Sequence, residues 1–482
     1  MEWKRQEILQ NYLNRDSFAP WVSGEEVKTK GAPKMLRKAG SETQWKQLVQ
    51  GDSRTVEQAT EAAQKQFLKW SATPPPERGK ILRTVADLLL ENKDILAETM
   101  AHEMGKPITQ GRGEVDYSAG FFSWFAGEAE RIYGKTVPSQ RSEQRILLIQ
   151  QPIGVCALIA PWNFPLAMPA RKVAAALAAG CTMVVKPSSS SVLSSLLLVQ
   201  LLEQAGVPPG VVNVVFGEGD EIGFSLCRSP IIRKLSFTGS VSVGKKLYAQ
   251  CAGTLKKLTL ELGGNAPTIV YEDADLDKAV QATVDGKFRN NGQTCVCPNR
   301  IYVQSSVYNA FAERFIEAVR QLKVGDALDP ETDVSTFLMP SSIEKVNAHV
   351  KDAVEKGAEL HSCGDETHCP KVLKHVNDTM RIYQEETFGP VAAITSFETD
   401  QEVIEKANDS QYGLASYVFT QSLERAQHTA ENLEYGIVGL NDGIPSNPRA
   451  SFGGVKESGF GREGGPHGLQ EYQMEKYISL VT

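Results

Sequence analysis

Cys295 lies in a segment, residues 290–300, that is small, polar and rich in turn-forming residues. A structural cysteine usually lies in an apolar run, where it packs as a small hydrophobic side chain. Asn291 and Gly292 instead permit unusual backbone angles, and the two residues before the cysteine are polar. We therefore expect Cys295 to face a cleft, where a thiolate can act as a nucleophile if other segments supply its partners. Without such partners, Cys295 is a loop cysteine with no role in chemistry.

The segment that can supply those partners is residues 153–262, where apolar strands alternate with helical stretches rich in Ala and Leu. This alternation predicts βαβ units and therefore a parallel, doubly wound sheet. Ligands of such sheets bind at the carboxyl ends of the strands, so the residues just after each strand are the candidates for function. The strands are expected at 155–160, 182–185, 211–216, 234–237 and 257–260.

Polar and small residues follow these strands. The glycines at 217, 219 and 223 do not match the common G-x-G-x-x-G fingerprint, because the third glycine comes one residue too late. Gly239 and Gly244, between a strand and a helix, either admit a pyrophosphate to the helix N-terminus or serve packing alone. Lys186, at a strand end, is placed to hydrogen-bond a ribose hydroxyl, although a solvated surface lysine would fit the same pattern. Glu261, at another strand end, can equally be a capping carboxylate.

The remainder of the N-terminal third predicts helices and one unusual strand. The Thr-Pro-Pro-Pro run at 73–76 excludes a helix and marks a boundary. One helix is expected from Glu77 to the Gly-Lys-Pro at 105–107, and another at about 114–131. Residues 146–151 form an apolar strand between two turn-rich segments, which we expect to project as an arm. Its edge needs a partner strand, which a second copy of the chain can supply, so we expect a homodimer or homotetramer.

Composition limits the possible partners and location. The 482 residues are 41% hydrophobic, enough for two or three lobes of roughly 100 to 250 residues. A formal net charge of −7 leaves no basic stripe for nucleic acid. Eight cysteines without framework spacing indicate reduced thiols, and the start shows no leader. No apolar run reaches the ~18 residues of a membrane span, so we expect a cytoplasmic protein. The His and Cys residues at 361–369 lie outside the chemical motifs, so no metal site is expected.

Seven motifs, taken in order, resemble those of the aldehyde dehydrogenase superfamily, and the match runs from about residue 75 to the end of the chain. They are Pro161-Trp162-Asn163-Phe164-Pro165, Lys186-Pro187-Ser188, Phe237-Thr238-Gly239-Ser240, Glu261-Leu262-Gly263-Gly264, Gly292-Gln293-Thr294-Cys295, Glu386-Thr387-Phe388-Gly389-Pro390 and Phe452-Gly453-Gly454-Val455-Lys456-Glu457-Ser458-Gly459. Within the superfamily, residues 288–297 together with Arg171-Lys172 most resemble the succinate-semialdehyde dehydrogenases. Two segments depart from the pattern: residues 30–50 lack the usual N-P-x-x-G, and residues 333–336 stand where a Gly-Pro is customary.

The resemblance implies an α/β fold with three parts. A doubly wound, parallel-sheet dinucleotide-binding domain is expected from residues 1–133 and 153–262. A second α/β domain, the catalytic one, is expected from 263–450. Residues 134–152 and 451–482 are expected to form a small β oligomerisation element.

The chemistry implied is the oxidation of an aldehyde by hydride transfer, which needs a tetrahedral adduct first. Cys295 as a thiolate would form that adduct, a thiohemiacetal. The side-chain amide of Asn163 and the backbone N–H of Cys295 would stabilise its oxyanion, by roughly 3 to 4 kcal/mol per donor. After hydride transfer to nicotinamide, Glu261 would act as the general base for the water that hydrolyses the thioester.

The resemblance also implies that the cofactor is NADP or NAD. In family members restricted to NAD, an acidic side chain often stands three residues beyond the strand-end lysine and repels a 2′-phosphate. Ser189 occupies that position, so NADP should be accepted. Glu386 matches a residue that holds the nicotinamide ribose. The cofactor contacts expected are Trp162, Lys186, Ser188, Ser189, Gly239, Ser240, Leu262, Glu386 and Phe388.

The substrate implied is a small aldehyde with a distal carboxylate, succinate semialdehyde, bound by Arg171, Arg289 and Ser446. Arg171 falls in the first turn of a helix expected to start near Pro169, where the macrodipole disfavours a cation, so a compensating group is expected. Internal salt bridges of both arginines are the alternative. Glutarate semialdehyde and general aliphatic aldehydes remain possible substrates. Cys297 is close enough to Cys295 for a strained regulatory disulfide.

Two other classes of protein stay open. A cysteine hydrolase could use the same thioester chemistry without redox, but it has no use for Lys186, Glu386 or the Gly239 turn. A catalytically silent structural relative has no reason to retain Cys295 together with Glu261. A dehydrogenase should reduce the dinucleotide when an aldehyde is added, which is seen as an increase in absorbance at 340 nm. The two other classes should not.

Overall fold

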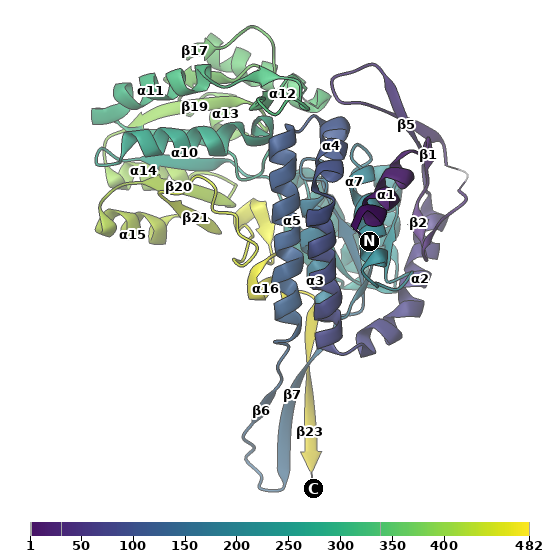
Figure 1. The fold of residues 1–482 in the computed structure, drawn as a ribbon. Helices are drawn as coiled ribbons and strands as arrows, with labels where there is room; N and C mark the ends of the chain where they lie inside the picture. The colour runs from purple at the N-terminus through teal and green to yellow at the C-terminus, as the bar shows by residue number, and fades with distance from the viewer. Residues whose placement is uncertain (1, 30, 338, 482) are drawn as a thin grey trace.

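The computed structural model describes residues 2–29, 31–337 and 339–481, and its centre is an eight-stranded sheet (Figure 1). The predicted doubly wound α/β fold is confirmed, because five of the strands are parallel neighbours in the order β12-β11-β8-β9-β10. Short strands border this core, β22 antiparallel to β12 and β2 antiparallel to β10. The bounds are β8 Val155–Ile159, β9 Thr182–Lys186, β10 Val212–Val214, β11 Ile232–Thr238, β12 Lys257–Glu261, β22 Gly459–Phe460, β2 Trp21–Val22 and β3 Glu25–Glu26.

Helices cover both faces of this sheet because its strands are apolar on both sides. Along β8, Cys156 and Leu158 join the core under α3, α5, α6 and α7. Their neighbours Val155 and Ala157 join the core under α2, α8 and α9. Successive side chains of one strand thus serve opposite layers. The helices are α2 Ser53–Ala72, α3 Pro75–Glu91, α4 Lys93–Met104, α5 Ile108–Ala129, α6 Ala167–Ala179, α7 Leu193–Gln204, α8 Gly219–Arg228 and α9 Val241–Cys251.

The helix boundaries of the N-terminal part correct three expectations. The prolines at 73–76 do end α2, but Pro75 begins α3, since the first helical position needs no backbone N–H. The single helix expected from Glu77 to 105–107 is two helices. Asn92 breaks it: its side-chain Nδ2 donates to Leu88 O at 2.8 Å, and its backbone leaves helical geometry at φ −105° and ψ 22°. The helix expected from 114 begins six residues earlier, directly after Pro107.

Within the first fifty residues, where the customary family segment is missing, β2 and β3 join the first sheet and the other elements form a separate layer. Helix α1 (Glu2–Leu13) is followed by a three-stranded sheet in the order β1-β5-β4. Its strands are β1 Ser17–Phe18, β4 Pro33–Arg37 and β5 Gln44–Val49. Phe18 and Leu48 bury this sheet against the same core as α3 to α7.

A second, seven-stranded sheet in the order β17-β18-β19-β14-β13-β20-β21 is also mainly parallel. Two apolar clusters pack on its faces, with alternate residues of β13 and β14 facing each. The strands are β13 Ala266–Val270, β14 Pro298–Gln304, β17 Glu359–Ser362, β18 Lys371–Lys374, β19 Val391–Phe397, β20 Ala415–Phe419 and β21 Ile437–Leu440; the helices are α10 Leu276–Phe288, α11 Tyr308–Arg320, α12 Pro340–Glu355, α13 Arg381–Gln384, α14 Asp400–Asn408 and α15 Leu423–Asn432. A short pair, β15 Val324–Gly325 and β16 Val334–Ser335, lies beside it.

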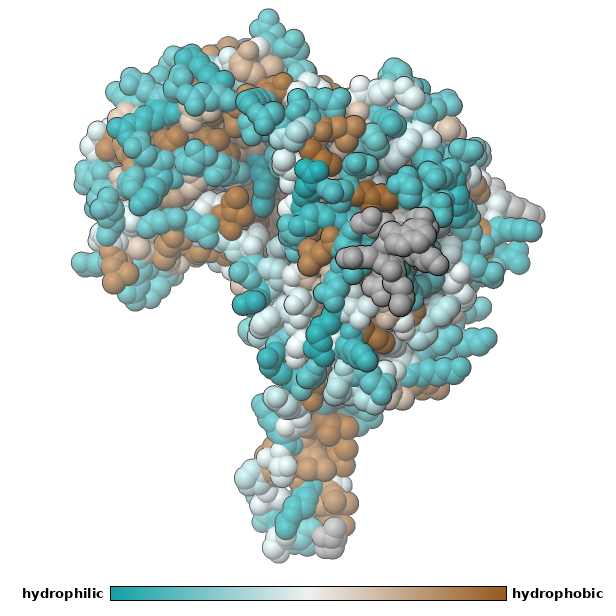
Figure 2. All heavy atoms as spheres, in the orientation of Figure 1, coloured by the Kyte–Doolittle hydropathy of each residue, from teal (hydrophilic) through white to brown (hydrophobic). Residues whose placement is uncertain are grey.

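The arm is a three-stranded sheet that projects from the body (Figure 1). The predicted strand at 146–151 is confirmed as part of β7 (Gln144–Pro152), which pairs with β6 (Lys135–Val137) and β23 (Gln473–Val481). Within the chain, β23 pairs with one edge of β7 along its whole length, and β6 pairs with the other edge at residues 146–148, so a second chain is not needed along these paired stretches. Figure 2 shows hydrophobic side chains on the arm, where Leu480 and Val481 are exposed.

The C-terminal segment divides between the arm and the body. Only β23 of residues 451–482 joins the arm, whereas β22 extends the first sheet and α16 (Gly465–Gln470) packs against α5 and α6. No helix within the described ranges is long and apolar enough to cross a membrane.

Candidate active site

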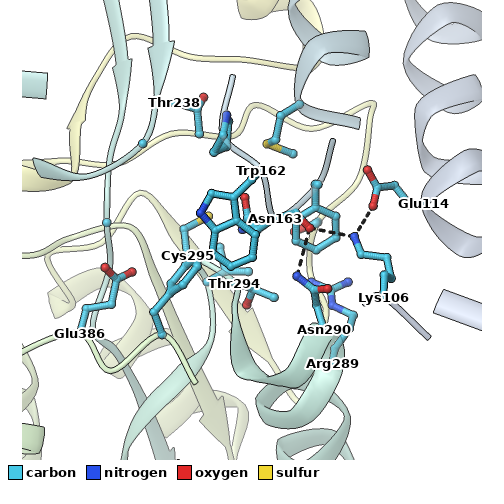
Figure 3. A pocket seen from close by; sticks show the side chains of 18 of the residues that line it. Lys106, Glu114, Trp162, Asn163, Thr238, Arg289, Asn290, Thr294, Cys295 and Glu386 are labelled. Atoms are coloured by element: carbon cyan, nitrogen blue, oxygen red, sulfur yellow. Dashed lines mark hydrogen bonds and ion pairs between the residues drawn. The ribbon is translucent and has the colours of Figure 1, made fainter. Parts of the chain in front are cut away.

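A cavity of about 650 Å³ opens where loops at the carboxyl ends of the first sheet meet loops of the second (Figure 3). The first sheet contributes the segments after β8, β11 and β12, as a parallel sheet predicts. The second contributes the Cys295 loop and the segment before β19. The expected site residues that line the cavity are Trp162, Asn163, Arg171, Gly239, Ser240, Leu262, Arg289, Cys295, Glu386, Phe388 and Ser446. The others, Glu261, Lys186, Ser188 and Ser189, lie outside its lining.

The Cys295 loop is built on three consecutive left-handed residues. Asn290, Asn291 and Gly292 have φ of 51°, 55° and 71°. A Cβ at Gly292 would lie 2.2 Å from Gly389 O, so only glycine permits this approach to the segment before β19. Cys295 is half-buried at the cavity wall, as expected. Burial raises the pKa of Cys295 to about 12 while the Arg171 guanidinium opposes the rise, so the free thiol rests protonated.

Asn163 lies against the Cys295 loop. Its side-chain Nδ2 donates to Gln293 O at 2.9 Å, which uses one of its two N–H groups. Figure 3 shows the Asn163 amide beside Cys295 and Thr294. The second N–H is therefore available to an oxygen bound at the sulfur.

A buried ion pair that the sequence did not reveal holds the Asn163 loop (Figure 3). Lys106 pairs with Glu114, and each side chain is 1% exposed. Lys106 Nζ also donates to Asn163 O at 2.8 Å. Glu114 Oε1 accepts the backbone N–H groups of Leu166 and Ala167, both at 2.9 Å, at the start of α6. The pair thus fixes both ends of the turn that carries the amide.

Glu261 ends β12 beside the cavity. Both of its carboxylate oxygens are buried without a hydrogen-bond partner among the described residues. Burial, then the Glu463 carboxylate, raises the pKa of Glu261 well above its ordinary value, while Arg171 and Lys172 oppose the rise. A Cβ at Gly453 would lie 2.9 Å from Oε1, so the side chain is turned toward that glycine.

The two arginines have different surroundings. Helix α6 starts at Ala167, four residues before Arg171. The expectation that Arg171 lies in the first turn of this helix is therefore wrong. The expected compensating group is Glu463, whose Oε2 lies 2.5 Å from Arg171 Nε. Arg289 is half-buried, stands 5.7 Å over the Phe164 ring and makes no ion pair with any residue that the structure describes. The internal salt bridge alternative thus holds for Arg171 and is not supported for Arg289.

One wall of the cavity is formed by Glu386 and two aromatic rings. Glu386 Oε1 accepts the backbone N–H of Gly264 at 3.1 Å, and burial raises the pKa of Glu386 to about 7. Trp162 and Phe388 contact edge to face with centroids 5.7 Å apart. Ser341, Ser342 and Lys345, from the start of α12, also line the cavity, and the sequence analysis missed them.

Gly239, between β11 and α9, and Gly244, inside α9, are required for packing. A Cβ at Gly239 would lie 2.4 Å from the Phe237 ring, and one at Gly244 would lie 2.5 Å from Leu262. The backbone of Gly239 and Ser240 still lines the cavity at the N-terminus of α9, and Thr238 Oγ1 is buried without a partner among the described residues. This helix terminus and the free hydroxyl fit the pyrophosphate of a dinucleotide.

Lys186, Ser188 and Ser189 follow β9 at a distance from the cavity. Burial lowers the pKa of Lys186, which is 9% exposed, while Glu218 opposes the shift. Ser189 Oγ donates to Gly217 O at 3.0 Å, so its proton is already used. Lys34, from β4, donates to Ser189 O at 3.3 Å and brings a further cation that the sequence analysis missed.

A thiol, an amide and a buried carboxylate close to one cavity are the groups that cysteine-dependent aldehyde oxidation uses. The chain belongs to the aldehyde dehydrogenase family, whose profile matches residues 22–478. It is an NAD(P)-dependent aldehyde dehydrogenase. The predicted resemblance is thereby confirmed. No group of three or more His, Cys, Asp or Glu side chains within the described ranges could hold a metal ion.

Among its relatives, the chain is similar to dehydrogenases that are named for semialdehydes. The chain is 48% identical over 426 residues to glutarate-semialdehyde dehydrogenase of Pseudomonas putida, covering 88% of this chain and 89% of that one. It is 48% identical over 429 residues to the NADP(+) succinate-semialdehyde dehydrogenase GabD of Escherichia coli, covering 88% and 89%. The crystal structure of succinate-semialdehyde dehydrogenase from Burkholderia pseudomallei superimposes with a TM-score of 0.94 at 44% identity, covering 96% and 98%.

Proposed function

We propose that the protein oxidises succinate semialdehyde to succinate with NADP or NAD. The observation that carries this substrate is Arg289, a cation in the cavity wall without a counter-ion among the described residues. A planar guanidinium suits bidentate binding of a carboxylate. Ser446 lines the same cavity and can add a hydroxyl contact. The succinate-semialdehyde dehydrogenases among the relatives support the same choice.

Arg171 plays a second part in this pocket. Because Glu463 already neutralises it, we infer that Arg171 contributes less to carboxylate binding than Arg289 does. Its field favours the Cys295 thiolate instead, since the guanidinium lowers the pKa of that thiol.

The first half of the reaction follows from the geometry of the Cys295 loop. The Cys295 thiolate attacks the aldehyde carbon and forms a thiohemiacetal oxyanion. The free N–H of the Asn163 amide and the backbone N–H of Cys295 donate to that oxygen, each worth roughly 3 to 4 kcal/mol in related sites. Glu386 and Phe388 would hold the nicotinamide of a bound cofactor, which would supply the hydride acceptor. Loss of hydride from the oxyanion's carbon leaves a thioester on Cys295.

The second half needs a base, and Glu261 is the candidate. Its unpaired oxygens are buried beside the cavity, so rotation of the side chain away from Gly453 can bring the carboxylate toward the thioester. There it takes a proton from the attacking water, and succinate leaves with regeneration of the Cys295 thiol.

We further propose the cofactor preference and the assembly. No acidic side chain stands at position 189, and Lys186 and Lys34 flank that turn, which supports acceptance of NADP as well as NAD. The three-part division into 1–133 with 153–262, 263–450, and 134–152 with 451–482 remains our proposal, except that β22 and α16 of the last segment go with the first sheet and its helices. Exposed apolar residues on the arm support a homodimer or homotetramer. Eight free cysteines support a reducing, cytoplasmic location.

Glutarate semialdehyde is the second candidate substrate, favoured by the Pseudomonas putida relative. It is one methylene longer, and one methylene usually changes discrimination only about 10- to 200-fold. General aliphatic aldehydes would need no free cation in the cavity. A non-redox hydrolase or a silent relative would leave the Glu386 and Phe388 side of the cavity without a purpose.

The test compares succinate semialdehyde with butanal, an aldehyde of equal chain length that lacks the carboxylate. We expect Arg289→Ala to lower kcat/KM for the semialdehyde about 30- to 1000-fold, which corresponds to a loss of roughly 2 to 4 kcal/mol in transition-state stabilisation. The same substitution should change kcat/KM for butanal little. Arg112→Ala, on an exposed face, is the control. Equal efficiency of the two aldehydes in the unmodified enzyme, or equal impairment of both by Arg289→Ala, would show that no carboxylate pocket exists.

A further inference from the structure

Two cysteines far from Cys295 occupy the ends of a loop at the edge of the second sheet. Strands β17 and β18 are antiparallel, and their last register pair is Ser362 with Lys371. Cys363 comes directly after Ser362, and Cys369 lies two residues before Lys371. The hairpin geometry therefore brings the two cysteines to the same end of the loop.

The loop folds Cys369 back toward the residues next to Cys363. Cys369 Sγ donates to Glu366 Oε2 at 3.6 Å, and a Cβ at Gly364, the residue after Cys363, would lie 3.1 Å from Cys369 Sγ. The hairpin register and this close approach place the two cysteines near enough for a bond between their sulfurs.

The two thiols differ in access. Cys363 is exposed to solvent, whereas Cys369 is 6% exposed. Burial, then the neighbouring Cys363 thiol, raises the pKa of Cys369 to about 12. Lys371 lies close to both sulfurs and its Nζ donates to Cys369 O at 3.1 Å, which fixes the ammonium beside the pair. One hairpin thus provides an exposed thiol, Cys363, that can attack a disulfide and a buried thiol, Cys369, that can resolve the mixed disulfide.

We propose that Cys363 and Cys369 form a thiol–disulfide exchange site whose substrates are small disulfides in solution. The Cys363 thiolate attacks one sulfur of the disulfide and expels the other as a thiolate, leaving a mixed disulfide on Cys363. Cys369, losing its proton to solvent, then attacks the Cys363 sulfur and expels the second small thiol. The protein gains one disulfide, its two thiols are oxidised, and the small disulfide is reduced to two thiols.

The other cysteines make this site selective. Four others, Cys156, Cys181, Cys227 and Cys251, are buried and out of reach of a solvent-borne disulfide. Cys295 is reached only through the catalytic cavity. Cys363 and Cys369 also lie outside the cavity lining, so formation of a disulfide between them should leave the rate of aldehyde oxidation unchanged.

The experiment uses oxidised glutathione as the probe on the full-length chain, unmodified and as Cys295→Ala to remove the catalytic thiol. After exposure, the protein is denatured in iodoacetamide and digested with trypsin. Cleavage after Lys356 and Lys371 leaves both cysteines on one peptide, residues 357–371. We expect this peptide to be unalkylated and lighter than its reduced form by two hydrogen atoms. Dithiothreitol before alkylation should restore two alkylation sites.

Matched variants identify each thiol's part. Cys369→Ser should stop at the mixed disulfide, so that Cys363 carries glutathione, while Cys363→Ser should leave Cys369 alkylated after denaturation. The buried Cys227 and Cys251 should remain alkylated throughout. Full alkylation of residues 357–371 in the unmodified chain, or a stable glutathione adduct on its Cys363, would overturn the proposal. Either outcome is independent of the aldehyde substrate, because the readout is mass and not turnover.

Discussion

Removal of the Lys106 ammonium tests whether a charge pair outside the reacting atoms controls the Asn163 amide. In Lys106→Met the Glu114 carboxylate, 1% exposed, loses its counter-ion but keeps the N–H groups of Leu166 and Ala167. Breaking a buried pair by removing one partner costs about 3 to 5 kcal/mol. The two remaining N–H donors place the expected loss of unfolding free energy near the lower limit, about 3 kcal/mol.

Catalysis should fall by a separate route. Asn163 O loses its bond from Lys106 Nζ and keeps only that from Asn290 Nδ2. A small displacement of a positioned group costs on the order of 100-fold. We therefore expect kcat to fall roughly 10- to 100-fold, with KM for the aldehyde changing less.

The assays are urea unfolding and steady-state kinetics, with Lys106→Met/Glu114→Gln as the rescue variant. The double variant leaves no buried charge, so it should lose less unfolding free energy than Lys106→Met alone. The control is Arg112→Met, which breaks the exposed Arg112–Asp94 pair between α5 and α4 and should cost at most about 1 kcal/mol. If Lys106→Met matches this control in both stability and kcat, the pair does not hold the amide.

Three further outcomes follow from the site. Glu261 must be ionised to act as a base, so thioester hydrolysis should rise with pH through its raised pKa; Glu463→Gln removes a like charge and should move that rise to lower pH, and an unmoved pH profile would exclude the coupling. Ser189→Glu should raise KM for NADP far more than KM for NAD, and equal effects would remove the argument from position 189. Peroxide inactivation that dithiothreitol reverses should become irreversible in Cys297→Ala; unchanged reversibility would exclude a disulfide with Cys295.

Sequence patterns predicted the parts of this fold that depend on local composition. The strands of the first sheet are buried on both faces, so their apolar runs at β8, β9 and β11 were visible without their partners. The sheet of β1, β4 and β5 was not, since Pro33–Arg37 and Gln44–Val49 mix basic and polar residues with apolar ones and become strands through pairing with each other.

The site shows the same division. The turn-forming residues around Cys295 predicted an accessible thiol because their requirement is local. The orientation of Glu261 was beyond a sequence pattern, because Arg171 and Glu463 set its surroundings from distant segments. Lys106 and Glu114 resemble surface charges in the sequence, and only the packing of α5 against α6 buries them together.

The pairing of β7 with β23 also has a consequence for synthesis. Gln144 Nε2 donates to Ser479 Oγ, 335 residues further along the chain. On a ribosome, β7 therefore emerges long before the strand that covers one of its edges, and the nascent chain carries an uncovered, apolar strand throughout translation of the second sheet. Such non-local pairing is slow, and uncovered strand edges promote aggregation. Nascent chains stalled before β23 should thus depend on chaperones that shield extended apolar segments.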